Sequence, residues 1–321
     1  MFGRDTLCGC GGIRSVLEMT QLVAIGVDVG GTKIAAVAVD ISTGLVLIQD
    51  KIPTQRHDGG ARVLDRLTSM IKTMHDQLQK IDIHSLGVGI GIPELVNNDG
   101  VIKSNWNFDW DKRSITDQLA EFGTVILESD ARTAALAEHH FGHGNSYPSF
   151  VFVTIGSGLS FSFCKDGNIH RGANGYAIHF GSSDILAICS DCGSQSAFNL
   201  EALASGRGLA ETYRNRTSEV TDARSLVDDD CGDAAKLLVD QATSALASYL
   251  GQLVNIFDPH AVIIGGGLGL APKLFEILEH KIRPHVWAPE CRSIPIVKSA
   301  ILENSAAIGA AVLFRAGADK Q

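Results

Sequence analysis

A glycine-centred strand meander occurs twice in the chain and restricts the folds that the chain can adopt. The first copy reads VAIGVDVGGTKIAAVAVDISTGLVLIQDKIP and the second reads PSFVFVTIGSGLSFSFCKDGNIHRG. Each consists of an apolar strand, a tight glycine turn, a second strand, a polar turn and a third strand. Gly30 and Gly156 occupy the equivalent turns. A duplication of this kind predicts two related units.

Helical periodicity and another apolar strand follow each meander. In the first half the strand SLGVGIGIP follows a run whose apolar residues recur every three or four positions: Val63, Leu64, Leu67, Ile71, Met74 and Leu78. In the second half AVIIGGG follows the long helical pattern AAKLLVDQATSALASYLGQLVNIF. We therefore expect two similar α/β lobes with a central cleft, where small ligands usually bind. Two unrelated α/β domains are the alternative.

Composition excludes several classes of partner. The 321 residues carry a formal net charge of −9, which argues against nucleic acid, since neutralising phosphates requires clustered Lys and Arg. No apolar run is long enough to span a bilayer, and the N-terminal segment lacks the continuous apolar stretch of a signal peptide. Met19, just before the first strand pattern, is a candidate translation start. Seven cysteines without framework spacing predict reduced thiols in a cytoplasmic protein with no membrane association.

Three glycine clusters suit a nucleotide. Glycines in a hairpin turn let backbone N–H groups converge on phosphate oxygens. The first turn contains Asp28, Gly30, Gly31, Thr32 and Lys33, and the second contains Thr154, Gly156, Ser157 and Gly158. Neither has the spacing of a Walker loop, and no run completes G-x-G-x-x-G. The third cluster, Gly265, Gly266 and Gly267, ends a strand, where a flat ligand such as adenine can approach the backbone.

These segments resemble the ROK family of sugar kinases and regulators. The resemblance extends through ESDARTAALAE, NGYAIHFG, NLEALASG, VNIFDPHAVIIGGG and AAIGAA, in order and spacing. It implies a duplicated actin-like, hexokinase-like ATPase fold of the ribonuclease H-like type. The implied division is an N-terminal tail over 1–21, a smaller lobe over 22–129 plus about 305–319, and a larger lobe over 130–304.

The resemblance also implies roles for the glycine clusters. Both hairpins would hold the phosphates of ATP, Gly265 to Gly267 would border the adenosine, and Asp28 would help to hold Mg²⁺ through water. Regulators of this family carry a DNA-binding helix-turn-helix before the first hairpin. The roughly twenty residues found there are too few for one, which favours the kinase branch. Members often form dimers, so we expect a homodimer.

Asp130 is the candidate catalytic base. It follows the apolar strand TVILES and precedes the helical pattern ARTAALAEHH, so its carboxylate lies at a strand end. Phosphoryl transfer to a hydroxyl needs one base to accept the proton. A helix N-cap is the competing role, since Asp fills that position well. The family motif, E-N-D-A-N-A-A, favours the base.

The expected sugar contacts depart from the family pattern. Asn107, in NFDW, matches an asparagine that contacts a sugar hydroxyl, whereas Ser129 replaces the asparagine of E-N-D. Registering NGYAIHFGSS on the family's G-E-x-G-H puts His179 in place of the sugar-binding Glu and Ser182 in place of the zinc-binding His. Glu201 matches a further sugar-binding Glu. Trp106 and Trp110 could flank a sugar ring or pack in the interior.

The zinc motif of the family is degenerate in this chain. Of the three cysteines in C-x-C-G-x-x-G-C only Cys192 remains in register. His179, Cys189 and Cys192 could form a rebuilt site, but a closed zinc site requires four ligands and no fourth is near in sequence, so we expect no zinc. Without metal, this stretch would depend on hydrogen bonds and on packing of four apolar residues: Phe180, Ile185, Leu186 and Ile188.

The sequence therefore predicts a kinase that uses ATP and Mg²⁺ to phosphorylate a hydroxyl of a sugar or sugar-like polyol, with Asp130 as general base. Because Ser129, His179 and Ser182 alter family contacts, we expect an acceptor other than plain glucose, such as an amino sugar or a cyclitol. A catalytically silent sugar sensor of the same family is the alternative. A DNA-binding repressor is disfavoured by the short N-terminal segment and the acidic charge.

Overall fold

Two five-stranded sheets built to one plan form the framework of the protein. The computed structural model describes residues 21–110, 114–228 and 231–315. The first sheet contains β1 (Val23–Val29), β2 (Lys33–Asp40), β3 (Val46–Pro53), β4 (Ser85–Ile92) and β5 (Thr124–Ser129). The second contains β6 (Ser149–Ile155), β7 (Leu159–Lys165), β8 (Asn168–Ile169), β11 (Ala261–Gly265) and β12 (Ile296–Lys298).

Strand order confirms the duplication. The first sheet runs β3-β2-β1-β4-β5, and the second, read in the same sense, runs β8-β7-β6-β11-β12. In each, the meander strands pair antiparallel and the last two strands add in parallel. The β1–β2 turn is closed by the N–H of Gly30 donating to the carbonyl of Lys33 at 2.9 Å, and the β6–β7 turn by Gly156 donating to Gly158 at 3.0 Å. The predicted duplicated α/β fold is therefore confirmed.

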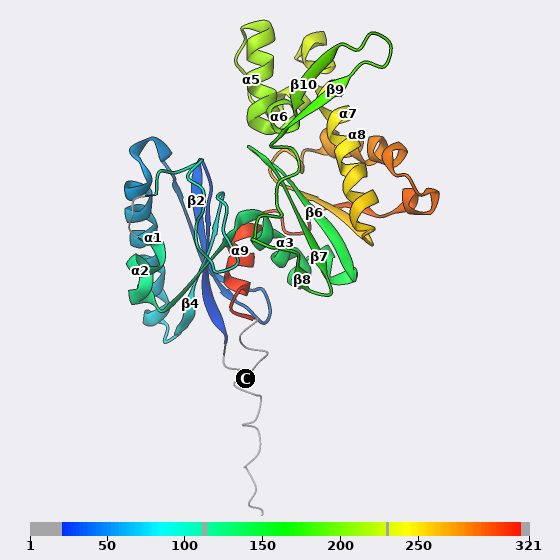
Figure 1. The fold of residues 1–321 in the computed structure, drawn as a ribbon. Coiled ribbons are helices and arrows are strands. Elements are labelled where there is room, and N and C mark those ends of the chain that lie inside the picture. The colour runs from blue at the N-terminus through cyan, green and yellow to red at the C-terminus, as the bar shows by residue number, and fades with distance from the viewer. Residues whose placement is uncertain (1–20, 111–113, 229–230, 316–321) are drawn as a thin grey trace, which may run out of the picture.

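Helices cover the outer face of each sheet (Figure 1). The predicted apolar stripe of α1 (Gly60–Lys80) is buried against the first sheet, with α2 (Ile115–Leu119) beside it. The long α7 (Gly232–Phe257) and α8 (Pro272–Ile282) cover the second sheet. Three further helices pack against α7 beyond the end of the second sheet: α4 (Leu200–Ala204), α5 (Gly206–Thr217) and α6 (Ala223–Asp228). Short 3-10 turns span Arg56–Asp58, Ala120–Phe122, His143–Ser146, Arg283–His285 and Pro289–Ser293.

Two helices, α3 (Asp130–Phe141) and α9 (Ser305–Val312), lie between the sheets (Figure 1). They pack unusually close, because a Cβ added to Gly309 of α9 would lie 1.6 Å from the carbonyl oxygen of Thr133 in α3. A Cβ added to Gly26 or Gly89 would lie 1.9 Å from a carbonyl oxygen of α9. The small residues of AAIGAA thus let one helix contact both the first sheet and α3.

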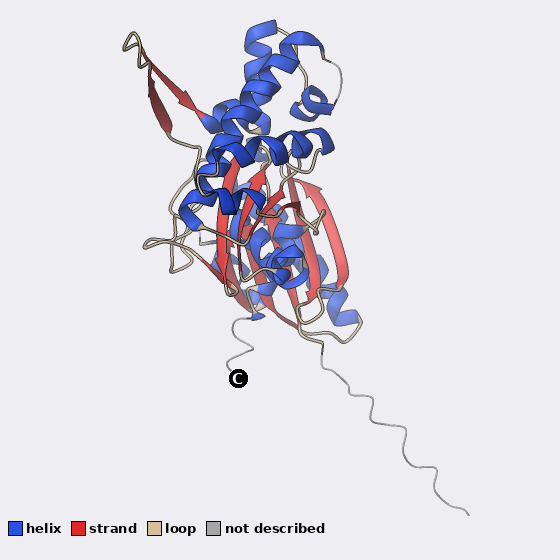
Figure 2. Cartoon of the chain, turned by 90° about the vertical axis from the view of Figure 1, so that its right-hand side faces the viewer, coloured by secondary structure: helices blue, strands red, loops and turns tan. Residues whose placement is uncertain are grey.

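A hairpin stands apart from both sheets (Figure 2). It consists of β9 (Asp184–Ile188) and β10 (Gln195–Asn199). The prediction that its apolar residues pack was wrong for three of the four: Ile185 is 42% exposed, Leu186 56% and Ile188 61%. Only Phe180 packs as expected, edge-on against Phe161. The hairpin makes too few contacts with the helical layer to cover these side chains.

The predicted N-terminal tail falls mainly on residues 1–20, outside the described part of the chain. No helix among the described residues is long and apolar enough to cross a membrane.

Candidate active site

A cavity of about 640 Å³ opens between the two sheets. Its walls combine the end of β1, the start of β2, the start of α3, the end of β6 and the segment that leads into α9. The residues that line it include Asp28, Lys33, Lys51, Asp130, Thr154, Gly266, Gly267, Glu303 and Asn304. Segments far apart in sequence therefore meet at one place, as the prediction of a central cleft requires.

Asp28 and Asp130 carry unusual carboxyl groups in this cavity. Burial and, to a smaller extent, repulsion by Asp130 raise the pKa of Asp28 to about 7, against the attraction of Lys33. Burial also raises the pKa of Asp130 to about 6, against hydrogen bonds from the Ala131 N–H and the Ser129 hydroxyl. Two carboxyl groups that share a cleft and resist ionisation are typical of functional sites.

Asp130 does not cap the helix that follows it. The N-cap position of α3 is Ser129, and Asp130 is already the first helical residue. Its Oδ1 accepts from the adjacent Ala131 N–H at 2.7 Å and lies 3.4 Å from Ser129 Oγ. Ser129 itself is fully buried. The capping alternative is therefore wrong, while the carboxylate remains directed to the cavity.

Two lysines meet opposite these acids. In the sheet register Asp28 of β1 pairs with Ala35 of β2, and Ala35 pairs with Lys51 of β3. The small Ala35 therefore lies between the carboxyl group of Asp28 and the side chain of Lys51. The pKa of Lys33 is lowered by loss of hydration and by the neighbouring Lys51 ammonium, against the attraction of Asp28 and Glu303. Lys51 was missed by the sequence reasoning. Alternation along β3 predicts that Lys51 and Gln49 share one face of the strand, but it does not predict which face meets the cavity.

The three glycine clusters contain positions where glycine has no steric purpose in the structure. A Cβ added to Gly31 or Gly267 would meet nothing within 4 Å, and one added to Gly156 only a methyl group at 4.0 Å. None of the three has a positive φ, unlike Gly266, whose φ is 82°. Since neither backbone conformation nor packing requires glycine there, approach of a ligand to the backbone is the remaining physical reason.

Not every predicted nucleotide residue lines the cavity. Its lining includes Asp28, Lys33, Thr154, Gly266 and Gly267. The others lie outside that lining, in the adjoining turns or, for Gly265, at the end of β11: Gly30, Gly31, Thr32, Gly156, Ser157, Gly158 and Gly265. Thr32 and Gly30 are tied to Thr54, whose N–H donates to the Thr32 carbonyl at 3.0 Å and whose hydroxyl donates to the Gly30 carbonyl at 2.6 Å.

A second polar group forms beside the second hairpin. Ser182 Oγ lies 3.2 Å from His179 Nδ1 and 3.2 Å from Glu201 Oε2. Glu201 also accepts from the N–H of Leu159 at 3.3 Å, which fixes it next to the β6–β7 turn. Loss of hydration lowers the pKa of His179, although the residue as a whole is exposed, and the Glu201 carboxylate opposes the shift. His179 and Glu201, predicted separately, thus share one hydrogen-bonded chain.

The first lobe contributes a loop to the same region. Trp106 is 67% exposed, and its ring lies 6.0 Å from that of His179 in a T-shaped arrangement. Trp110 instead packs on Phe108, with ring centroids 4.8 Å apart. Asn107 donates from Nδ2 to the carbonyl of Pro93 at 2.5 Å. Of the two tryptophans, only Trp106 is free to contact a ligand.

Glu94 anchors this loop and was not anticipated. It is 2% exposed and accepts from the backbone N–H groups of Trp106, Asn107 and Phe108 at 2.8–3.1 Å. Ser104 donates to the same carboxylate. Because a buried carboxylate with these donors is fully satisfied, it fixes the loop that presents Asn107 and Trp106.

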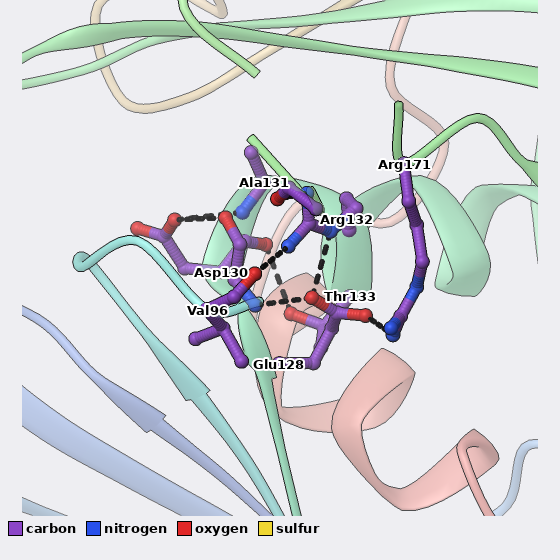
Figure 3. Close-up of polar contacts among 9 residues, drawn as sticks. Val96, Glu128, Asp130, Ala131, Arg132, Thr133 and Arg171 are labelled. Carbon is purple, nitrogen blue, oxygen red and sulfur yellow. Dashed lines mark hydrogen bonds and ion pairs between the residues drawn. The ribbon is translucent and has the colours of Figure 1, made fainter. Parts of the chain in front are cut away.

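A buried ion-pair network lies directly behind Asp130 (Figure 3). Arg132, fully buried, donates from Nε to Glu128 at 2.7 Å. Its other nitrogens donate to the carbonyls of Gly175 at 2.7 Å and Val96 at 3.1 Å. Arg171 donates to the second oxygen of Glu128. This network was also missed, because its members are distant in sequence apart from the i, i+4 pair.

The residues considered for zinc do not converge. Among the described residues, no group of three or more His, Cys, Asp or Glu side chains could hold a metal ion together. Cys189 and Cys192 are exposed beside the hairpin turn, whereas His179 pairs with Ser182 and Trp106. The absence of zinc remains a prediction.

Comparisons with a family model, with related sequences and with solved structures point to the same family. The model of the ROK family matches residues 24–317. A glucokinase from Thermotoga maritima is 30% identical, over 92% of this chain and 98% of its own length. An N-acetyl-D-glucosamine kinase from Haemophilus influenzae is 27% identical, over 90% and 98%. A Streptomyces griseus ROK glucokinase solved in complex with glucose and AMPPNP has a TM-score of 0.71 and 27% identity, covering 92% of this chain and 100% of its own.

Proposed function

The chain belongs to the ROK family, and we propose that it is a kinase that transfers the terminal phosphoryl group of ATP to a hydroxyl of a sugar or sugar-like polyol. The observation that carries this proposal is the meeting of Asp28, Lys33 and Asp130 in one inter-lobe cavity bordered by the Gly266–Gly267 turn. Relatives named as kinases of glucose and of N-acetylglucosamine support the same reaction type.

The donor side would be bound by backbone and by ammonium groups. The sterically unneeded glycines at positions 31, 156 and 267 leave room for a phosphate chain to approach the backbone. Lys33 and Lys51 repel each other without an anion between them, so a triphosphate would relieve that repulsion. The Gly265–Gly267 turn, with Leu270 and Leu302 in the cavity wall, suits the adenosine.

Mg²⁺ fits the donor set that the chain provides. Magnesium in kinases binds through one or two carboxylates together with substrate phosphates and water. Asp28 supplies a carboxyl group whose ionisation is unfavourable without a cation nearby, because it is buried and is repelled by Asp130. When bound, the ion would neutralise charge on the transferred phosphoryl group.

Asp130 would act as the base. A pKa of about 6 keeps its carboxylate mostly ionised at neutral pH while leaving it basic enough to accept the acceptor's proton. Ser129 would position this carboxylate rather than contact the sugar, since its side chain is buried and its hydroxyl lies 3.4 Å from Asp130 Oδ1.

The acceptor would lie between the two lobes. His179 and Glu201 offer hydrogen bonds from one side, and Trp106 and Asn107 lie on the loop of the other. Neutral imidazole both donates and accepts, whereas a carboxylate only accepts, so His179 changes the hydroxyl pattern that is bound. We therefore propose an acceptor other than plain glucose, an amino sugar or a cyclitol being the candidates. A homodimer, testable by light scattering, is part of the same proposal.

The direct test is ADP release with ATP and Mg²⁺ across hexoses, N-acetylhexosamines and cyclitols. Asp130→Asn should reduce turnover by about 10²- to 10⁴-fold while AMPPNP binding persists, because only the base is lost. Asp82→Asn is the matched control, since Asp82 lies in an exposed turn with a positive φ that Asn also adopts.

Near-normal turnover of Asp130→Asn would remove the assignment of the base. Sugar binding without turnover of any acceptor by the unmodified chain would instead favour the sensor alternative. The choice of acceptor would follow from the ranking of kcat/KM across the panel, with glucose as the best substrate contradicting the proposed specificity.

A further inference from the structure

The Cys-x-x-Cys pair at the tip of the β9–β10 hairpin has no part in the proposed kinase reaction. Cys189 follows the last residue of β9 and Cys192 lies in the turn that leads to β10. Both side chains are exposed. Among the described residues the other cysteines differ: Cys164 is buried, and Cys231 and Cys291 are half-buried.

The turn holds the two thiols together. The N–H of Cys189 donates to the carbonyl of Ser194 at 2.9 Å, and the N–H of Gly193 donates to the carbonyl of Cys189 at 2.9 Å. Gly193 has a φ of 68°, which reverses the chain between the cysteines and β10. Both thiols therefore lie on one tight, solvent-exposed turn, three positions apart, where a disulfide needs little movement of the backbone.

The surroundings of Cys192 favour its thiolate. Its Sγ lies 3.1 Å from the hydroxyl of Ser194. Hydrogen bonds from the Ser194 side chain and backbone and from Cys189 lower the pKa of the Cys192 thiol to about 7. A thiolate, not a thiol, attacks disulfides and electrophiles.

We propose that Cys189 and Cys192 form a thiol–disulfide exchange site for small disulfides of the glutathione type, with Cys192 as the attacking thiol and Cys189 as the resolving thiol. The Cys192 thiolate attacks one sulfur of the oxidised tripeptide, forms a mixed disulfide and releases one reduced tripeptide. The Cys189 thiol then loses its proton, attacks the Cys192 sulfur and releases the second. The protein dithiol is oxidised by two electrons, and one disulfide is reduced to two thiols.

Oxidation would act on a segment linked to the acceptor region. Asn199, at the end of β10, donates to the carbonyl of Ser182 at 3.0 Å and caps α4, which carries Glu201. An isolated two-stranded hairpin is marginally stable in water. A cross-link at its tip restricts the open conformations of the hairpin, so oxidation should slow amide exchange at the N–H groups of Cys189 and Gly193.

The test uses the full chain and does not depend on kinase activity. With oxidised glutathione, the segment 172–207, which contains only these two cysteines, should lose two hydrogen atoms by peptide mass, retain no glutathione, and recover on addition of dithiothreitol. Cys189→Ser should stop at one bound glutathione. Cys192→Ser should not form the disulfide, and Cys231→Ser is the control that should behave as wild type.

Alkylation rates provide the second measurement. At pH 7 a thiol of pKa about 7 is roughly half ionised, against about one part in a hundred at the ordinary value of 9.0. Lower basicity reduces nucleophilicity in part, so iodoacetamide should modify Cys192 roughly fivefold faster than an unperturbed exposed thiol. The rate should titrate near pH 7. Accumulation of a stable wild-type glutathione adduct, alkylation of Cys192 no faster than Cys291, or thiols masked by stoichiometric zinc would each overturn the proposal.

Discussion

At the scale of single residues, the two cavity aspartates oppose folding. The pKa of Asp28 rises from 3.8 to about 7 in the folded protein, chiefly by burial. A carboxyl group with a raised folded-state pKa stabilises the fold fully below its unfolded pKa, and this contribution is lost as the pH rises through the folded pKa. Such local instability is common where a site is arranged for a ligand rather than for stability.

Asp28→Asn should therefore make the protein more stable and less active. At pH 8 we expect the free energy of unfolding to rise by about 1 to 2 kcal/mol, below the full value of the shift because the side chain retains some solvent contact. At pH 5 the gain should shrink, since the wild-type carboxyl is then protonated in the folded state. Urea unfolding at both pH values checks this, and an equal gain at both would contradict it.

The raised pKa of Asp130 predicts how kcat/KM falls at acidic pH. A base works only when deprotonated, so kcat/KM should fall by about tenfold per pH unit below pH 6, the approximate pKa of this carboxyl. The measurement is kcat/KM from pH 5 to 8 at saturating ATP. A constant kcat/KM between pH 8 and pH 5 would contradict a base with this raised pKa.

At the scale of elements, glycines of equal appearance in the sequence do different things. Gly309 lets α9 lie against α3, since any Cβ would overlap the Thr133 carbonyl. Gly31, in the β1–β2 turn, has open space around it and no positive φ. The first is needed by the fold, and the second is explained by the proposed phosphate contact.

A matched pair of alanine variants separates these roles. Gly309→Ala should lower the free energy of unfolding by about 3 kcal/mol or more, because α9 must shift from both the sheet and α3. Gly31→Ala should change stability by less than about 0.5 kcal/mol but raise the KM for ATP by roughly tenfold. Thermal unfolding and ATP titrations measure both effects. Loss of stability without loss of ATP affinity in Gly31→Ala would contradict the phosphate contact.

At the scale of the whole molecule, Arg132 joins the parts that form the cleft. It starts from α3, pairs with Glu128 at the end of β5, and donates to the loop after β4 at Val96 and to the loop after β8 at Gly175. Asp130 lies two residues before it on the same helix. The position of the base relative to both lobes therefore depends on this buried guanidinium.

Arg132→Met should destabilise the protein by about 3 to 5 kcal/mol, because it leaves the carboxylate of Glu128 buried with Arg171 as its one remaining cationic partner among the described residues. The double variant Glu128→Gln, Arg132→Met should recover part of that loss, since the buried carboxylate is gone and the Arg171 charge that remains is partly exposed. Denaturant unfolding of the single and double variants gives the coupling energy. Additive losses would show that the two side chains act independently.

The sequence by itself determined the two strand meanders, the helix and strand that follow each, and the three glycine clusters. These features depend on local patterns: alternation of apolar residues, turns that need glycine, and helical periodicity, as in Val63 to Leu78. Asp28, Lys33 and Asp130 could be located because each adjoins such a local signal.

Only the tertiary structure decided which side chains share a cavity and which remain uncovered. The positions of Lys51, Glu94 and Arg132 depend on contacts with residues 10 or more positions away in the sequence. No local sequence pattern encodes such contacts. The apolar residues Ile185, Leu186 and Ile188 were predicted to pack and are exposed, because burial depends on what the rest of the chain brings against a strand. The local sequence determines which helix or strand forms, whereas the contacts of a site are made between different helices, strands and loops.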